Sequence, residues 1–341
     1  MRQIVTRVGK QLSGMLFMAI CLSGALLPNI ALSQSVLGAS PFETYVSDNG
    51  EPAKLMKIVN SAFEQAELDV ELRVMRDAFL GSAVLIGKVD GRFAYIQLGE
   101  NTDEYVLSNI YLPINLYAVS KKFGVENVMR FAHLNDNRVA VENRFANTPE
   151  FRLLKNIKWS RNPSTFDAFK QLADDRAPYL VTTKLLAEEF NLLLENDNEE
   201  QLHFSGKPLM TTGFQIALRK NVPNAKATIE AFNKAISVMQ KLGQFNEILK
   251  KPWLTKDVNN DNVADFIASS AVTRTNHTLE HAYALDNYAT SSKSLYVVNG
   301  QSFNTLEDAQ EALEAANAQE NASQPQSSLD ATIYKQLIRK W

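Results

Sequence analysis

Between residues 54 and 97, the spacing of apolar positions changes from helical to strand-like and back. Five apolar residues share one face of the first predicted helix: Leu55, Ile58, Val59, Ala62 and Phe63. Residues 68–74 alternate with period two, residues 77–86 return to helical spacing until Gly87, and residues 92–97 form a strand after a turn at Asp90. The order of elements is therefore strand and helix in alternation.

The same alternation returns after residue 137. Strands are predicted at residues 137–143, 157–162 and 177–183, with helices opened by Thr148 and by Ser164 between them. Such alternation favours parallel sheets covered by helices. Two long extended segments join the two groups: residues 112–118 and residues 211–218. We therefore expect two α/β lobes joined by two crossings, a clam-shell that can hinge around a ligand.

The first residues have the pattern of a secretory signal. Arg2, Arg7 and Lys10 precede an apolar run at residues 15–32, and small residues follow it up to Ser33. We expect residues 1–33 to be a cleaved signal peptide and the protein to be periplasmic. The only cysteine, Cys21, lies in this segment, so the remainder has no thiol for disulfides, nucleophilic catalysis or metal ligation.

Charge gives no indication of a nucleic-acid partner. The formal net charge is −3, and no basic stripe appears along the chain. We therefore expect no nucleic-acid partner.

Several motifs, in order, resemble one known family. They are SPFE at residues 40–43, GKVDG at 87–91, LSNIYLPINLYAVSKK at 107–122, LNDNRVAVENRFANTPEF at 134–151, AFKQLADDRAPYLV at 168–181 and a long segment at 213–251. Together they are similar to the bacterial extracellular solute-binding proteins of family three, periplasmic receptors that pass amino acids and similar polar solutes to ABC importers. The resemblance covers roughly residues 36–253.

The resemblance implies an α/β fold of the two-lobe, type II periplasmic-binding-protein class, with the ligand between the lobes. The expected boundaries are residues 34–114 with 215–253 for the first lobe, 115–214 for the second, and 254–341 for a small C-terminal α+β extension. The resemblance implies two kinds of partner, a small polar solute and the membrane subunits of an ABC importer. We expect a monomer without enzymatic activity.

The chain departs from the family pattern where amino-acid receptors bind their ligand. Asn101 stands at the position of the arginine that binds the ligand carboxylate, Thr183 at that of the second-lobe aspartate, and Ala39 at that of an aromatic residue. An amide cannot replace the bidentate contact of a guanidinium. We therefore expect a ligand other than an ordinary α-amino acid.

Candidate ligand-binding residues follow predicted strand ends or lie near the crossings, where ligands bind in open α/β sheets. They are Phe42, Glu43, Arg76, Tyr95, Tyr111, Asn143, Arg144, Thr148 and Thr183. We expect Arg76 to substitute for the missing arginine. The residues around Arg144 precede a helix N-terminus, where an anion is favoured. Alternatives remain open: Phe42 and the tyrosines as core residues, Arg76 as a solvated charge, and Thr148 as a helix cap.

Asp257, Asn259, Asp261 and Asp265 in the extension follow the spacing of a calcium loop. Asn262 occupies the glycine position of that loop and Ala268 the position of its closing carboxylate, so an Asx-rich turn is the alternative. No other cofactor is expected.

The rest of the extension shows a hairpin pattern around Asn299 and Gly300, a helical pattern at 306–318 and a linker-like composition at 319–328. We expect this region to dock on the first lobe.

Two other functions fit the same fold. One is a periplasmic enzyme similar to the cyclohexadienyl dehydratases, with Glu43 as the acid. The other is a degenerate module that senses or binds a partner protein and has lost its ligand, which the missing arginine favours.

Overall fold

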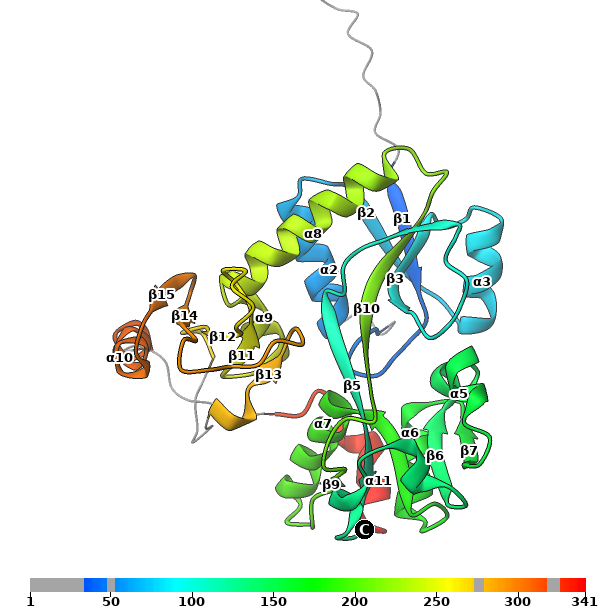
Figure 1. Ribbon diagram of the computed structural model, residues 1–341. Coiled ribbons are helices and arrows are strands. Elements are labelled where there is room, and N and C mark those ends of the chain that lie inside the picture. The colour runs from blue at the N-terminus through cyan, green and yellow to red at the C-terminus, as the bar shows by residue number, and fades with distance from the viewer. Residues whose placement is uncertain (1–33, 48–52, 273–278, 318–325) are drawn as a thin grey trace, which may run out of the picture. The chain divides into compact units, whose positions relative to one another are not determined.

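Alternating strands and helices at the start of the described chain build the first lobe. The computed structural model describes residues 34–47, 53–272, 279–317 and 326–341, so the predicted signal peptide and most of the predicted linker lie outside the described residues. The first-lobe elements are β1 (Ser35–Ala39), α2 (Lys54–Gln65), β2 (Val70–Val74), α3 (Asp77–Leu85), β3 (Gly91–Ile96), β4 (Tyr105–Leu107), α8 (Ala225–Lys241) and α9 (Gln244–Leu249). Helices α2 and α8 pack against each other, and α3 lies across the sheet from them (Figure 1).

The GKVDG motif joins α3 to β3 and ties β3 to its neighbours. Gly87 ends the helix with a φ of +75°, a conformation that favours glycine. A Cβ on Gly91 would lie 2.2 Å from the carbonyl oxygen of Ala217, so only glycine allows this strand pairing. The Asp90 carboxylate accepts a hydrogen bond from the Val36 amide at 2.9 Å, which anchors the turn to β1.

The second lobe repeats the alternation. Its elements are η1 (Val125–Asn127), η2 (Phe131–Leu134), β6 (Arg138–Glu142), α4 (Asn143–Ala146), α5 (Pro149–Leu153), β7 (Lys158–Asn162), α6 (Thr165–Ala173), β8 (Tyr179–Thr183), α7 (Lys184–Asn196) and β9 (His203–Phe204). Strand β6 lies between β8 and β7, parallel to both.

Two long strands connect the lobes, as the sequence predicts. They are β5 (Leu112–Ser120) and β10 (Met210–Arg219), which pair antiparallel with Phe214 opposite Leu112 (Figure 1). Strand β10 continues along β3, and β5 continues along β8, with Leu116 opposite Thr183. Among the described residues a single ten-stranded sheet results, in the order β2-β1-β3-β10-β5-β8-β6-β7 with β4 and β9 on the side. The predicted two-lobe α/β class with two crossings is confirmed.

The C-terminal extension forms a second sheet. Its elements are β11 (Leu254–Lys256), β12 (Asp265–Ala268), η3 (Leu279–His281), β13 (Tyr283–Ala284), β14 (Tyr296–Val298), β15 (Gln301–Phe303), α10 (Leu306–Asn317) and α11 (Ala331–Ile338). The predicted hairpin at Asn299 and Gly300 is confirmed, because both residues have positive φ between the paired strands β14 and β15.

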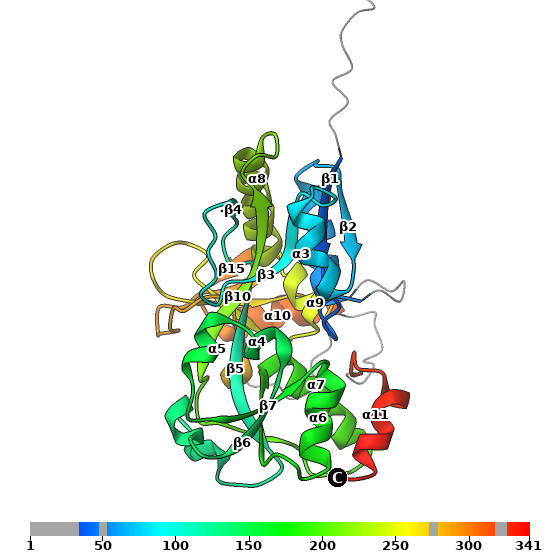
Figure 2. The same cartoon turned by 90° about the vertical axis from the view of Figure 1, so that its right-hand side faces the viewer.

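The extension docks in two places, whereas the sequence predicts only the first lobe. Its sheet contacts the first lobe and the first crossing: the Asn246 side chain donates to the Ile267 carbonyl at 2.9 Å, and the Tyr283 hydroxyl donates to the Pro113 carbonyl. Helix α11, however, packs against α6 and α7 of the second lobe (Figure 2). Tyr334 and Leu337 of α11 are buried there.

In the part of the chain that the structure describes, no helix has the length and apolar character needed to cross a membrane.

Candidate functional site

The carboxyl ends of β1, β6 and β8 meet in one region, which we call the interlobe site. It consists of Phe42, Glu43 and Tyr45 after β1, Glu142 and Arg144 around the end of β6, Thr183 at the end of β8, and Tyr334 of α11. In open α/β sheets this end of the strands is where ligands bind. Four of the predicted ligand-binding residues come together here: Phe42, Glu43, Arg144 and Thr183.

Arg144 of the second lobe contacts the first lobe directly. Its guanidinium carbon lies 3.8 Å from the ring centre of Phe42, and its Nη2 donates to the Pro41 carbonyl at 2.7 Å. Its Nε donates to the Glu142 carboxylate at 3.1 Å. Phe42 is only 2 % exposed and also packs on Tyr45, so its ring is both core and part of the site. The guanidinium therefore links the lobes through a cation–π contact and one hydrogen bond, while its bond to Glu142 stays within the second lobe.

A buried pair of hydroxyls makes a second link. The Tyr45 and Thr183 side-chain oxygens are 2.8 Å apart, and both residues are fully buried. The Thr183 hydroxyl also accepts from the Leu186 amide at 3.3 Å, so Thr183 is the N-cap of α7. Burial raises the pKa of Tyr45 far above its ordinary value, so this phenol stays neutral.

A third link joins Glu43 to the C-terminal helix. The Tyr334 hydroxyl donates to the Glu43 carboxylate. Burial raises the pKa of Glu43; the bond from Tyr334 opposes this shift and the negative charge of Glu142 adds to it. The charges of Glu142, Arg144 and Asp167 all act on the Glu43 carboxylate.

Replacing Glu43 by glutamine tests this electrostatic arrangement. Because the pKa of Glu43 is higher in the folded than in the unfolded protein, its ionisation lowers the free energy of unfolding as pH rises from about 4.5 through the folded-state pKa. We expect the stability of Glu43→Gln relative to wild type to increase over this window. Thermal unfolding of both proteins between pH 4 and 8 measures the difference. A difference that is flat with pH contradicts the assignment.

A buried ion pair lies beside the site. The Lys54 ammonium, at the start of α2, contacts the Glu189 carboxylate of α7, and both side chains are at most 10 % exposed. The C-terminal segment completes the pair: the Ser328 amide donates to Glu189 at 2.6 Å, and Lys54 donates to the Ser328 hydroxyl at 3.2 Å. Burial alone would raise the pKa of Glu189, but Lys54 and Ser328 together bring it below the ordinary value.

Three predicted residues lie elsewhere in the first lobe. Arg76 is exposed at the N-cap of α3. Tyr95 stacks on Tyr105 with ring centres 6.5 Å apart, and the Tyr111 hydroxyl donates to the Phe93 carbonyl inside the lobe.

Two predicted residues lie near Arg144 without a described contact to the first lobe. Asn143 is the first residue of α4, and the Thr148 hydroxyl donates to the Phe145 carbonyl at 2.7 Å. Thr148 is nevertheless the N-cap residue of α5, so the capping position suggested by the sequence is confirmed although its side chain bonds elsewhere.

Sequence reasoning missed Tyr45, Lys54, Glu189 and Tyr334. Each has a partner more than 100 positions away along the chain, so no local spacing indicates the contact. Lys54 and Glu189 stand on amphipathic helices, where charged residues ordinarily face water. The one available signal was the aromatic Tyr45 close to the predicted Phe42.

The predicted calcium loop forms a network of Asx turns. Asp257 accepts hydrogen bonds from the Asp261 and Asn262 amides at 3.1 and 2.9 Å, and Asp265 accepts from the Val258 and Leu295 amides. Asn259 accepts from the Asp261 amide. Within the described ranges, no cluster of three or more acidic, His or Cys side chains suited to a metal is found. Calcium at this loop stays a prediction.

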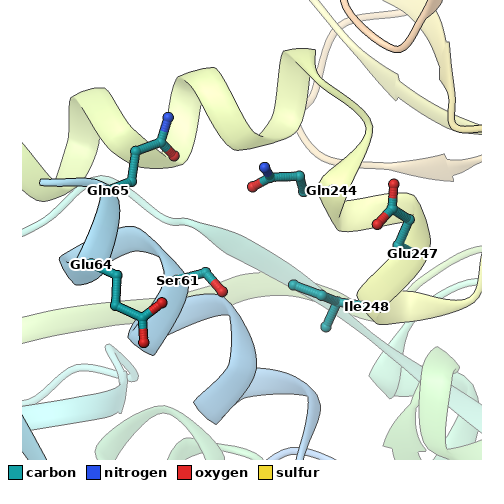
Figure 3. A pocket seen from close by; sticks show the side chains of 6 residues that line it. All are labelled: Ser61, Glu64, Gln65, Gln244, Glu247 and Ile248. Atoms are coloured by element: carbon teal, nitrogen blue, oxygen red, sulfur yellow. The ribbon is translucent and has the colours of Figure 1, made fainter.

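Cavities of the described residues include two outside the interlobe site. One, of about 440 Å³, lies between α2 and α9, where the polar side chains of Glu64, Gln65, Gln244 and Glu247 border it (Figure 3). The other, of about 250 Å³, lies between α8 and the loop after β11.

Solved structures of known proteins match the fold of this chain, whereas comparisons of its sequence find no match. No protein-family model matches the chain, and no curated protein matches its sequence. Solved structures do match. The GluR0 ligand-binding core from Nostoc punctiforme in complex with L-glutamate superposes with a TM-score of 0.52 at 16% identity, over 64% of this chain and 98% of the other.

Two further structures give the same result. The arginine-, lysine-, histidine-binding protein ArtJ from Geobacillus stearothermophilus has a TM-score of 0.51 at 16% identity, over 64% of this chain and 94% of its own. A mutant of ArgBP from T. maritima has a TM-score of 0.50 at 20% identity, over 64% and 94%. At such low identity the likeness is one of fold. The protein therefore has the two-lobe, type II fold of these binding proteins.

Proposed function

We propose that this protein is a periplasmic solute-binding protein that closes its two lobes on a small polar solute and presents the closed form to the membrane subunits of an ABC importer. The observation that carries the proposal is the convergence of Glu43, Arg144 and Thr183, from both lobes, at the carboxyl ends of strands in this fold. Closure requires no covalent chemistry, so the proposal assigns no catalytic residue.

The charges of the interlobe site favour a solute with a cationic group. The carboxylates of Glu142 and Asp167 both act on that of Glu43, and the guanidinium of Arg144 opposes them. Burial is the main cause of the raised pKa of Glu43, and a bound cation would offset the repulsion that Glu142 and Asp167 add to it. The Thr44 hydroxyl, next to Glu43 in the chain, is buried without a hydrogen-bond partner, and a polar ligand would supply one.

A thermal-shift screen tests the proposal. Amines, basic and acidic amino acids, short peptides and organic acids are added to the purified protein, since a ligand that binds only the folded state raises Tm. At a concentration of about 100 times Kd, the expected stabilisation is about 2.7 kcal/mol. We expect a cationic solute to give such a shift and Glu43→Gln to reduce its affinity about tenfold. Glu195→Gln, on the exposed part of α7, is the matched control and should bind normally.

The proposal fails if no solute class stabilises the protein, or if the binding solute has equal affinity for wild type and Glu43→Gln.

A second function is favoured by a specific observation: the groups of the interlobe site already bond to one another. Arg144, Tyr45 and Glu43 each have a partner from the opposite lobe or from α11. A protein closed by its own side chains would be a sensory or partner-binding module without a solute. Small-angle X-ray scattering separates the two. A receptor contracts when its solute is added, whereas a self-closed module keeps the same radius of gyration.

A further inference from the structure

A second polar cavity lies where the C-terminal extension meets the first lobe. It has a volume of about 250 Å³ and is bordered by three segments: Asn109–Tyr111 before β5, the second half of α8 with Ser237 and Lys241, and residues 256–260 from the last residue of β11 onward. A water molecule occupies about 30 Å³ of the liquid, so the cavity is large enough for a small molecule.

The side chains around this cavity offer hydrogen-bond donors. Lys241 and Ser237 have no side-chain hydrogen bond or ion pair among the described residues. Lys256 has three donor positions and uses one on the Gln240 side-chain oxygen. No carboxylate of the described chain lies within ion-pair distance of its ammonium.

Two acceptor side chains at the cavity, Asp257 and Asn233, already accept hydrogen bonds. Both oxygens of the Asp257 carboxylate accept amide hydrogen bonds from its own loop, at 3.1 and 2.9 Å. The Asn233 side-chain oxygen accepts from the Asn109 amide at 3.0 Å. Free lysine and serine donors beside these occupied acceptors favour an anion with several oxygens.

The position of Lys256 is fixed by its surroundings. Gln240 is 1 % exposed, and its amide nitrogen donates to the Tyr111 carbonyl at 3.1 Å, which turns its oxygen toward Lys256. Burial lowers the pKa of Lys256, while the charges of Asp286 and Asp257 oppose this shift. A partly buried ammonium therefore lies at this cavity in a fixed orientation.

We propose that this cavity binds a small oxyanion, a phosphate or carboxylate group, through Lys256 and Lys241. Two positively charged lysines and one negatively charged aspartate line the cavity, so the net charge of its lining is positive. The site borders Tyr111, directly before the first crossing strand, and β11, whose neighbour β13 bonds to Pro113 of that strand. An anion bound there links the extension to the crossing and stabilises the contact between them.

Titration of the purified protein with sodium phosphate and, separately, sodium acetate tests the proposal, with ionic strength held constant by sodium chloride. Calorimetry and Tm are the readouts. We expect at least one of the two anions to bind and Lys256→Met to lower its affinity at least tenfold. Binding of phosphate alone identifies a phosphate group as the ligand chemistry, and binding of acetate alone identifies a carboxylate.

A second test variant and two comparison variants complete the experiment. Lys241→Gln is an exposed substitution that should fold normally and weaken binding severalfold, so the test stands even if Lys256→Met is unstable. Lys234→Gln, on the same helix but outside the cavity, should bind as wild type does. Arg144→Gln tells the two sites apart: an anion whose binding is lost in this variant is bound at the interlobe site and not at this cavity. The proposal is overturned if neither anion binds, or if both lysine variants of the cavity bind as tightly as wild type.

Discussion

Lys54→Met is expected to lower the free energy of unfolding by about 3–5 kcal/mol. The substitution keeps the length of the side chain but leaves the Glu189 carboxylate buried without its cation, and a buried charge that has lost its partner is strongly destabilising. Urea denaturation followed by circular dichroism measures the change.

The double variant Lys54→Met with Glu189→Leu distinguishes a lost ion pair from lost packing. Removing both charges at once leaves no unpaired ion, so most of the stability should return. The exposed pair Lys226 and Glu230, 3.9 Å apart on α8, provides the matched control, and Lys226→Met should change stability by less than about 1 kcal/mol. A loss below about 1 kcal/mol in Lys54→Met would mean that the pair is solvated in solution.

Much of the fold could be predicted because its signals are local. The period-two and helical patterns between residues 54 and 97 give β2, α3 and β3, and the two long extended segments give the crossing strands β5 and β10. The same reasoning could not place α11. The surface that this helix covers depends on the aromatic groups of α6 and α7, which are far away in the chain.

The residues of the candidate site likewise include some that the sequence predicts and some that it does not. Phe42, Glu43 and Thr183 were predicted because residues that follow strand ends gather at one edge of a sheet. Arg76 satisfies the same rule but is exposed at the start of α3, because the rule gives the edge and not the direction of a long side chain. Lys54 and Glu189 were missed because lysine and glutamate side chains are usually exposed to solvent. Only the tertiary contact between α2 and α7 buries them.

Two substitutions of Tyr334 should separate the packing of α11 from its link to Glu43. Tyr334→Ala removes a buried ring that contacts Phe166, Phe169 and Phe190 at centre distances of 5.5, 6.2 and 5.7 Å, and we expect a loss of about 3–5 kcal/mol. Tyr334→Phe keeps the ring and removes only the hydroxyl that donates to Glu43. A hydrogen bond to a charged group contributes about 1.5–3 kcal/mol, which sets the expected loss.

Hydrogen exchange gives the readout that distinguishes the two roles. In Tyr334→Phe the amides of α11 should stay protected, while those of Tyr45 and Val46, which bond within the loop after β1, should exchange faster. In Tyr334→Ala both sets should exchange faster, because the helix itself loses its packing. If Tyr334→Phe leaves the loop as protected as in wild type, the hydroxyl does not hold the first lobe to α11, and Tyr334 acts through its ring alone.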